Sequence, residues 1–102
     1  MTKSEFEEKT KQGLVLVNFW APWCDPCMKM MPVVEKVVPT IDGLRLEKLL
    51  VDQSDETTEI ALGLKVTAIP TYLLYKEGKE AVRFSGVLSE EELKQKLMEG
   101  LR

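Results

Sequence analysis

Two cysteines separated by two residues are the side chains in this sequence best suited to chemistry. Cys24 and Cys27 lie in the segment Cys24-Asp25-Pro26-Cys27, and the chain has no other cysteine and no histidine. Two thiols at this spacing can close into a disulfide, and a helix amino terminus favours the thiolate that attacks other disulfides. We therefore expect Cys24 to be the exposed, attacking thiolate and Cys27 to be the resolving thiol.

Two other uses of the pair are compatible with its spacing. A structural disulfide that closes so short a loop contributes only about 2 kcal/mol, against about 3 kcal/mol for a fifteen-residue loop. Half of an intermolecular zinc or iron–sulfur site would leave the flanking Trp20, Pro22 and Trp23 unexplained. Two thiolates without histidine cannot complete a zinc site within one chain, so we expect no metal and no bound cofactor.

Length and composition limit the remaining classes of function. With 102 residues, 44% of them hydrophobic and 30% charged, the chain is expected to form a single domain over 1–102. A net charge of −3 gives no reason to expect nucleic acid or an anionic membrane as a partner. The polar start of the sequence and the absence of a long apolar run predict a cytoplasmic protein, in which such a cysteine pair is commonly redox-active.

The elements next to the cysteines determine where the two sulfurs lie. Residues 14–20 form an apolar run interrupted only by Asn18, which predicts a central strand buried on both faces, with Asn18 buried too. A helix is predicted from Pro26 to Val38, with Pro32 inside it as a kink. Both cysteines are thus expected where a buried strand gives way to a helix.

Capping residues, apolar alternation and turn residues predict the other elements. They are a first helix ending near Gly13, a strand at 44–52, a helix at 54–62, strands at 71–75 and 80–84 joined as a hairpin, and a last helix capped by Ser89 and Glu92. A right-handed crossover makes the first two strands parallel. The predicted α/β fold is a mixed sheet of about four strands, two parallel and then an antiparallel hairpin, with helices on both faces.

Several segments resemble, in order, the signatures of the thioredoxin family. They are the run from Phe19 to Cys27, Pro32, Lys48 with Val51-Asp52, Ala68-Ile69-Pro70-Thr71, and Gly86, within a similarity that runs from about Ser4 to the end of the chain. The resemblance implies a thioredoxin-like fold and a protein disulfide reductase that cycles between a dithiol and a disulfide. It also implies thioredoxin reductase or a similar electron donor, disulfide-containing protein substrates, and a monomer.

The same resemblance implies a substrate-binding site. It places a cis Ile69-Pro70 bond opposite the sulfurs, where the backbone next to Thr71 would pair with an extended substrate. A groove of Trp23, Ile69, Pro70, Gly86 and Val87 would accept unfolded or loop-borne disulfides. The alternative is a thioredoxin-fold binding or assembly module whose cysteines sense redox state without turnover.

Four positions depart from the family pattern. Asn18 stands where the family has a buried aspartate, so Lys48 is expected to lose its closest counter-charge and resolution by Cys27 to be slower; alternatively, Asn18 is a buried amide with satisfied hydrogen bonds. Asp25 replaces the usual glycine before Pro26, and Lys65 replaces a glycine after the third helix. The amino terminus is about one strand short, so the strand at 44–52 is expected to be a sheet edge.

Replacement of Asp25 by glycine tests whether this carboxylate tunes Cys24. At a separation of about 7 Å and an effective dielectric of about 40, the carboxylate opposes the thiolate by about 1 kcal/mol. We expect Asp25→Gly to lower the pKa of reduced Cys24, as measured by thiolate absorbance against pH. An unchanged or higher pKa would mean that Asp25 only suits the first turn of its helix.

Overall fold

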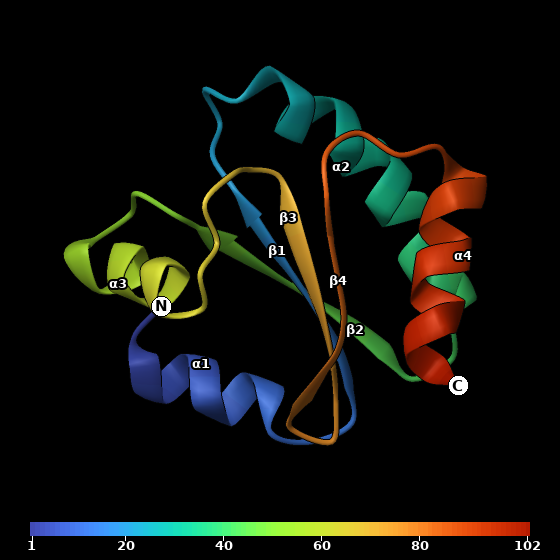
Figure 1. Cartoon of the computed structure of the whole chain (residues 1–102), viewed down its shortest axis with the longest axis horizontal. Helices are drawn as coiled ribbons and strands as arrows, with labels where there is room; N and C mark the ends of the chain where they lie inside the picture. Colours follow the sequence, from blue (N-terminus) through green and yellow to red (C-terminus); the bar gives the residue numbers. More distant parts are fainter.

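The computed structural model describes residues 1–102 and contains one sheet with helices on both of its faces (Figure 1). The elements in chain order are α1 (Lys3–Thr10), β1 (Leu14–Trp20), α2 (Asp25–Val37), the 3₁₀ helix η1 (Val38–Thr40), β2 (Leu44–Leu50), α3 (Asp55–Gly63), β3 (Thr71–Lys76), β4 (Lys79–Ser85) and α4 (Glu90–Leu101).

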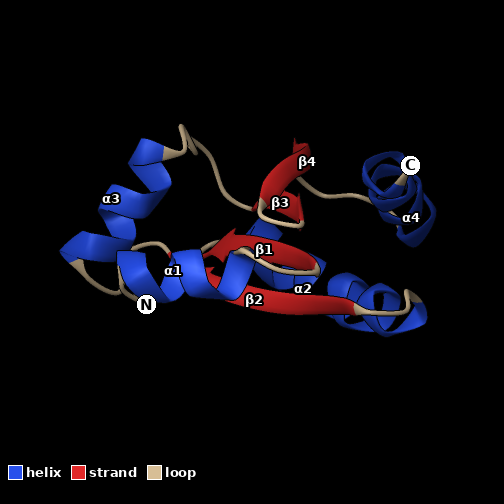
Figure 2. Cartoon of the chain, turned by 90° about the horizontal axis from the view of Figure 1, so that it is seen from below, coloured by secondary structure: helices blue, strands red, loops and turns tan.

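The four strands lie in the order β2-β1-β3-β4. β1 and β2 are parallel, whereas β1 with β3 and β3 with β4 are antiparallel. The predicted mixed sheet is therefore confirmed, and so is the thioredoxin-like arrangement of a parallel pair followed by a hairpin. Figure 2 shows α1 and α3 to one side of the sheet and α2 and α4 to the other.

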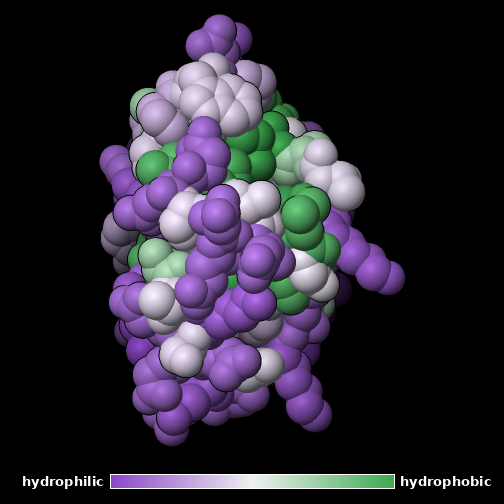
Figure 3. Space-filling model, turned by 90° about the vertical axis from the view of Figure 1, so that its left-hand side faces the viewer, coloured by the Kyte–Doolittle hydropathy of each residue, from purple (hydrophilic) through white to green (hydrophobic).

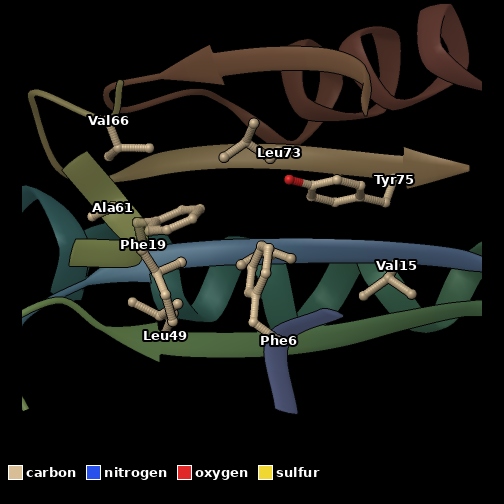
Figure 4. Close-up of a cluster of buried hydrophobic side chains, with 10 residues drawn as sticks. Phe6, Val15, Phe19, Leu49, Ala61, Val66, Leu73 and Tyr75 are labelled. Carbon is tan, nitrogen blue, oxygen red and sulfur yellow. The ribbon is translucent and has the colours of Figure 1, made fainter. Parts of the chain in front are cut away.

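Side-chain alternation along β1 and β3 divides the core into two clusters. Phe6 of α1 and Ala61 of α3 pack with Phe19 of β1 and Tyr75 of β3 on one face (Figure 4). The rings of Phe6 and Tyr75 meet edge to face, with their centroids 5.9 Å apart. On the other face, the residues that α2, α4, β1 and β3 contribute include Met30, Val34, Leu93, Leu97, Leu16, Tyr72 and Leu74. Because both clusters share β1 and β3, these central strands are held from both sides, which fixes the end of β1.

Local capping signals set most helix boundaries. Thr2 and Glu5 form a capping box at α1, and Ser89 and Glu92 form another at α4, as predicted for α4. α1 ends at Thr10 rather than near Gly13. The connection between β3 and β4 is a tight hairpin turn in which Glu77 and Gly78 both have positive φ, 51° and 82°.

The second strand is shorter than predicted. β2 ends at Leu50 rather than at Asp52, because the chain turns there: the Gln53 amide donates to the Leu50 carbonyl at 3.2 Å. The Val51 amide still donates to the Trp20 carbonyl of β1 at 3.0 Å. β2 is an edge strand, as expected.

None of the helices has the length and apolar character needed to cross a membrane.

Gly100 of α4 marks a close approach between the last helix and the sheet. A Cβ atom at this position would lie 2.6 Å from Leu74 Cδ2 and 2.8 Å from Val82 Cγ1. Overpacking of this kind costs about 1–3 kcal/mol, which exceeds the gain of about 1 kcal/mol from replacing a helical glycine by alanine. We expect Gly100→Ala to lower the free energy of unfolding measured with urea.

Gly63, at the end of α3, provides the matched control. A Cβ atom at Gly63 would meet no atom within 4 Å. Gly63→Ala should therefore leave the free energy of unfolding unchanged or slightly higher. Equal stability of the two alanine variants would contradict a tight contact at Gly100.

Candidate functional site

The two cysteines lie at the junction of β1 and α2 and are joined as a disulfide. Their Cα atoms are 5.2 Å apart. Cys24 is the N-cap of α2, and its sulfur accepts a hydrogen bond from the Cys27 amide at 3.2 Å. Asp25 lies exposed in the first turn, and Pro26 next to it suits a position where an amide hydrogen has no helical partner. A sulfur thus occupies the place that a serine or aspartate oxygen takes in ordinary caps.

Cys24 is less accessible than the sequence predicts. In the disulfide form Cys24 is 6% exposed and Cys27 is 1% exposed, so the expected exposure of Cys24 is wrong for this state. The reason is local packing, because the two cysteines form a buried cluster with Ala21, and the partly buried Ile69 packs against this cluster. Cys24 Sγ also lies 3.8 Å from the Ile69 carbonyl oxygen.

The segment before β3 supplies the wall opposite the sulfurs. The Ile69-Pro70 bond is cis, as predicted. Pro70 is tied to the segment after β4 because the Gly86 amide donates to the Pro70 carbonyl at 3.0 Å. The buried Thr71 hydroxyl donates to the Ala68 carbonyl at 2.6 Å, so it braces the bend. The structure thus brings Ile69, Pro70, Thr71 and Gly86 together.

An apolar hollow of about 280 Å³ opens beside this wall, toward α3. Its lining residues are Trp23, Val51, Asp52, Thr58, Ala61, Leu62, Val66, Thr67, Ala68 and Ile69. Trp23 is 66% exposed and Leu62 is 65% exposed. Figure 3 shows the corresponding side of the molecule, where hydrophobic surface gathers among hydrophilic side chains. Val87, exposed after β4, does not line this hollow.

Sequence reasoning assigned no role to Asp52. The Trp23 indole Nε1–H donates to Asp52 Oδ2 at 2.8 Å, which holds the indole ring over the hollow. The residues of α3 that line the hollow were also missed. No local signal could reveal them, because each contact joins positions that are distant in the sequence. No group of three or more cysteine, aspartate or glutamate residues is arranged to hold a metal ion.

Comparison with known proteins places this site in a family. The family model named Thioredoxin matches residues 1–99. The chain belongs to the thioredoxin family. It is 37% identical to the thioredoxin of Listeria monocytogenes over 94 residues, which is 91% of this chain and 88% of that protein, and 40% identical to the thioredoxin of Bacillus subtilis over 79 residues, 76% and 73% respectively.

A solved structure has the same architecture. One of its chains matches with a TM-score of 0.79 and 30% identity, covering 90% of this chain and 84% of that one. It comes from work on the thiol resolving mechanism of a yeast mitochondrial 1-Cys peroxiredoxin via glutathione and thioredoxin systems. The thioredoxin-family chain described here is a thiol–disulfide oxidoreductase. Its family implies reduction by a reductase and substrates that contain disulfides.

Asn18, where the family has an aspartate, is buried without full hydrogen bonding. It is 1% exposed; its amide Nδ2 donates to Met31 Sδ at 3.7 Å, and Oδ1 has no partner. Tyr72, its register partner on β3, has a buried hydroxyl that also lacks a partner, and burial raises the pKa of that hydroxyl. Within the protein, then, only the amide nitrogen of Asn18 has a partner, and that partner is a sulfur. Met31 lies one helical turn after Cys27, so Asn18 lies just beneath the helical turn that carries the resolving thiol.

Lys48 has a counter-charge that the sequence did not suggest. Its Nζ lies 2.8 Å from Glu35 Oε1 of α2. The family pattern directs attention only to position 18, whereas α2 carries Glu35 across from β2. Lys48 pairs in register with Asn18, but its ammonium group is partly exposed and held by Glu35.

An aspartate at position 18 would restore an ionisable group beneath α2. Burial raises the pKa of such a carboxyl toward neutrality, where it can accept the Cys27 proton. We expect Asn18→Asp to speed release of product from the mixed disulfide near neutral pH, as followed by stopped-flow fluorescence.

Asn18→Leu is the control for this experiment, since it removes the polar group without adding a base. It should not speed product release. If Asn18→Asp gave no gain over the wild type, proton acceptance at position 18 would not limit resolution in this chain.

Proposed function

We propose that this chain reduces disulfides in proteins, with Cys24 as the attacking thiolate and Cys27 as the resolving thiol. The observation that carries the proposal is the position of the Cys24 sulfur as the N-cap of α2, 3.2 Å from the Cys27 amide. In the reduced protein, that amide and the positive end of the helix dipole would stabilise a thiolate at Cys24. Cys27 is fully buried and is therefore suited to internal attack only.

The proposed cycle balances in two exchanges. The Cys24 thiolate attacks one sulfur of the substrate disulfide; that disulfide bond breaks, and the other substrate sulfur leaves as a thiolate that takes up a proton. Cys27 then loses its proton and attacks the Cys24 sulfur of the mixed disulfide. The second substrate thiol leaves, and the Cys24–Cys27 disulfide forms. Two electrons have passed to the substrate, and an external thiol donor must return them.

The proposed substrate-binding surface surrounds the Cys24 sulfur. It is supported by the exposure of Trp23 and Val87, by the proximity of the Ile69 carbonyl to the sulfur, and by the tie between Pro70 and Gly86. Its proposed members are Trp23, Ile69, Pro70, Thr71, Gly86 and Val87, with Asp25, Pro26, Asn18 and Lys48 tuning the site. An extended substrate segment would pair with the backbone next to Pro70, as a strand adds to an edge.

The finer assignments are inferences from the family. We propose thioredoxin reductase or a similar donor as the source of electrons, disulfide-containing proteins as substrates, and a cytoplasmic monomer over 1–102 that needs no bound cofactor. Nucleic acid and membrane are not proposed as partners, because the net charge is −3.

Single cysteine variants test the assignment of roles. With dithiothreitol as electron source and a protein disulfide as substrate, Cys24→Ser should abolish turnover. Cys27→Ser, reduced beforehand and freed of dithiothreitol, should still attack but stop at a mixed disulfide, which non-reducing electrophoresis and mass spectrometry would detect. The wild type should turn over many times.

The other possible results separate the alternatives. A binding or assembly module would show no wild-type turnover to abolish. Mixed disulfide in the Cys24→Ser variant, with none in the Cys27→Ser variant, would reverse the two roles.

A further inference from the structure

The segment from Leu64 to Pro70, which joins α3 to β3, is anchored from outside by one side chain of β4. Arg83 Nη1 donates to the Leu64 carbonyl at 2.8 Å and to the Lys65 carbonyl at 3.5 Å. The same segment carries Ile69, whose carbonyl lies beside Cys24 Sγ. Arg83 therefore holds the beginning of the segment that ends at the sulfurs.

The guanidinium group is itself oriented by Glu80. Arg83 Nε donates to Glu80 Oε2 at 2.9 Å, and Arg83 Nη2 donates to Glu80 Oε1 at 2.8 Å. This two-pronged pair fixes the plane of the guanidinium, so that Nη1 points at the two carbonyls. Hydrogen bonding with Arg83 also lowers the pKa of Glu80, so the carboxylate remains charged well below neutral pH.

The backbone needs such an anchor at this point. Lys65 has a φ of +60°, a left-handed conformation that costs a residue other than glycine about 1 kcal/mol or more. The amides of Lys65 and Val66 are satisfied by the end of α3, since they donate to the Leu62 and Ala61 carbonyls at 3.0 and 2.9 Å. Arg83 is the side chain that satisfies carbonyls on the outer side of this bend.

Arg83 lies away from the reacting atoms. It pairs in register with Leu73, whose side chain belongs to the cluster beneath α1 and α3. The sulfur of Cys24 has its own contacts, with the Cys27 amide and the Ile69 carbonyl, and Arg83 makes none of them. Loss of Arg83 should therefore change the shape of the segment and leave the chemistry at sulfur as it is.

We propose that Arg83 is a positioning residue for protein substrates: by holding the Leu64 and Lys65 carbonyls, it keeps the segment up to Pro70 in the shape that receives an extended polypeptide. This inference rests on the proposed function, because it assumes that substrate pairs with this segment. A small disulfide, which needs only access to the sulfur, makes no use of the anchor. Arg83 therefore favours protein disulfides over small ones.

The test compares two substrates across matched variants. Arg83→Met keeps the apolar stem and removes every donor. Arg83→Lys keeps the charge without the planar fork. Lys79→Met is the control, because it removes another exposed positive charge of β4. Each is assayed on a protein disulfide with dithiothreitol as electron source. Each is then reduced beforehand, freed of dithiothreitol and mixed with 5,5′-dithiobis(2-nitrobenzoate) in a single turnover. Circular dichroism verifies that each variant is folded.

We expect Arg83→Met to raise KM for the protein disulfide by about fivefold, which corresponds to about 1 kcal/mol, with kcat changed less than about twofold. Arg83→Lys should raise the same KM less, and Lys79→Met should not raise it. The rate with the small disulfide and the equilibrium with glutathione should stay at wild-type values in all variants.

Two results would overturn the inference. One is an unchanged KM for the protein disulfide in both Arg83 variants. The other is an equal loss with both substrates in Arg83→Lys or Arg83→Met, which would make Arg83 a residue of general stability. Failure of the proposed function is distinguishable from both, because the wild type itself would then show no catalytic turnover of the protein disulfide.

Discussion

The hydrogen bond from the Cys27 amide to the Cys24 sulfur is the contact on which the geometry of the site depends. The nitrogen and the sulfur are 3.2 Å apart, and the bond makes the Cys24 side chain the N-cap of α2. The helix therefore starts at the reactive group itself. That start can lie only where β1 leaves the sheet. β1 is fixed in turn because Val15 to Phe19 are buried between two hydrophobic clusters. The position of one sulfur is thus decided by the packing of the whole sheet.

The opposite wall of the site is held in a different way. The segment between α3 and β3 has no regular structure, and side chains and backbone from β3, β4 and the residue after β4 keep it in place. Gly86 binds the Pro70 carbonyl, Thr71 binds the Ala68 carbonyl, and Arg83 binds the Leu64 carbonyl. The N-cap of α2 and the bend before β3 therefore meet at the Cys24–Cys27 disulfide. Different strands of the same sheet hold each of them in place.

Sequence reasoning succeeded where structure depends on neighbours along the chain. The apolar run of β1, the capping box at Ser89 and the cysteine spacing are local signals, and they predicted the central strand, the last helix and the junction that carries the sulfurs. It failed where side chains meet across elements. The Glu35–Lys48 pair, the Trp23–Asp52 hydrogen bond and the Arg83 anchor each join residues that only the folded chain brings together. The end of β2 was misjudged for a different reason, because a local turn, closed by the Gln53 amide on the Leu50 carbonyl, ends the strand two residues early.

The hydrogen bond between Trp23 and Asp52 has a further consequence. An aromatic side chain that is two-thirds exposed would ordinarily move among rotamers. Binding a partner over it would then cost the conformational entropy that the side chain loses. Here the indole is already held by a carboxylate at 2.8 Å, so much of that ordering is complete before anything binds. The ring offers a flat apolar plane, and side chains of different shapes can pack against it. Such a surface can bind segments of different sequence while its own shape stays constant.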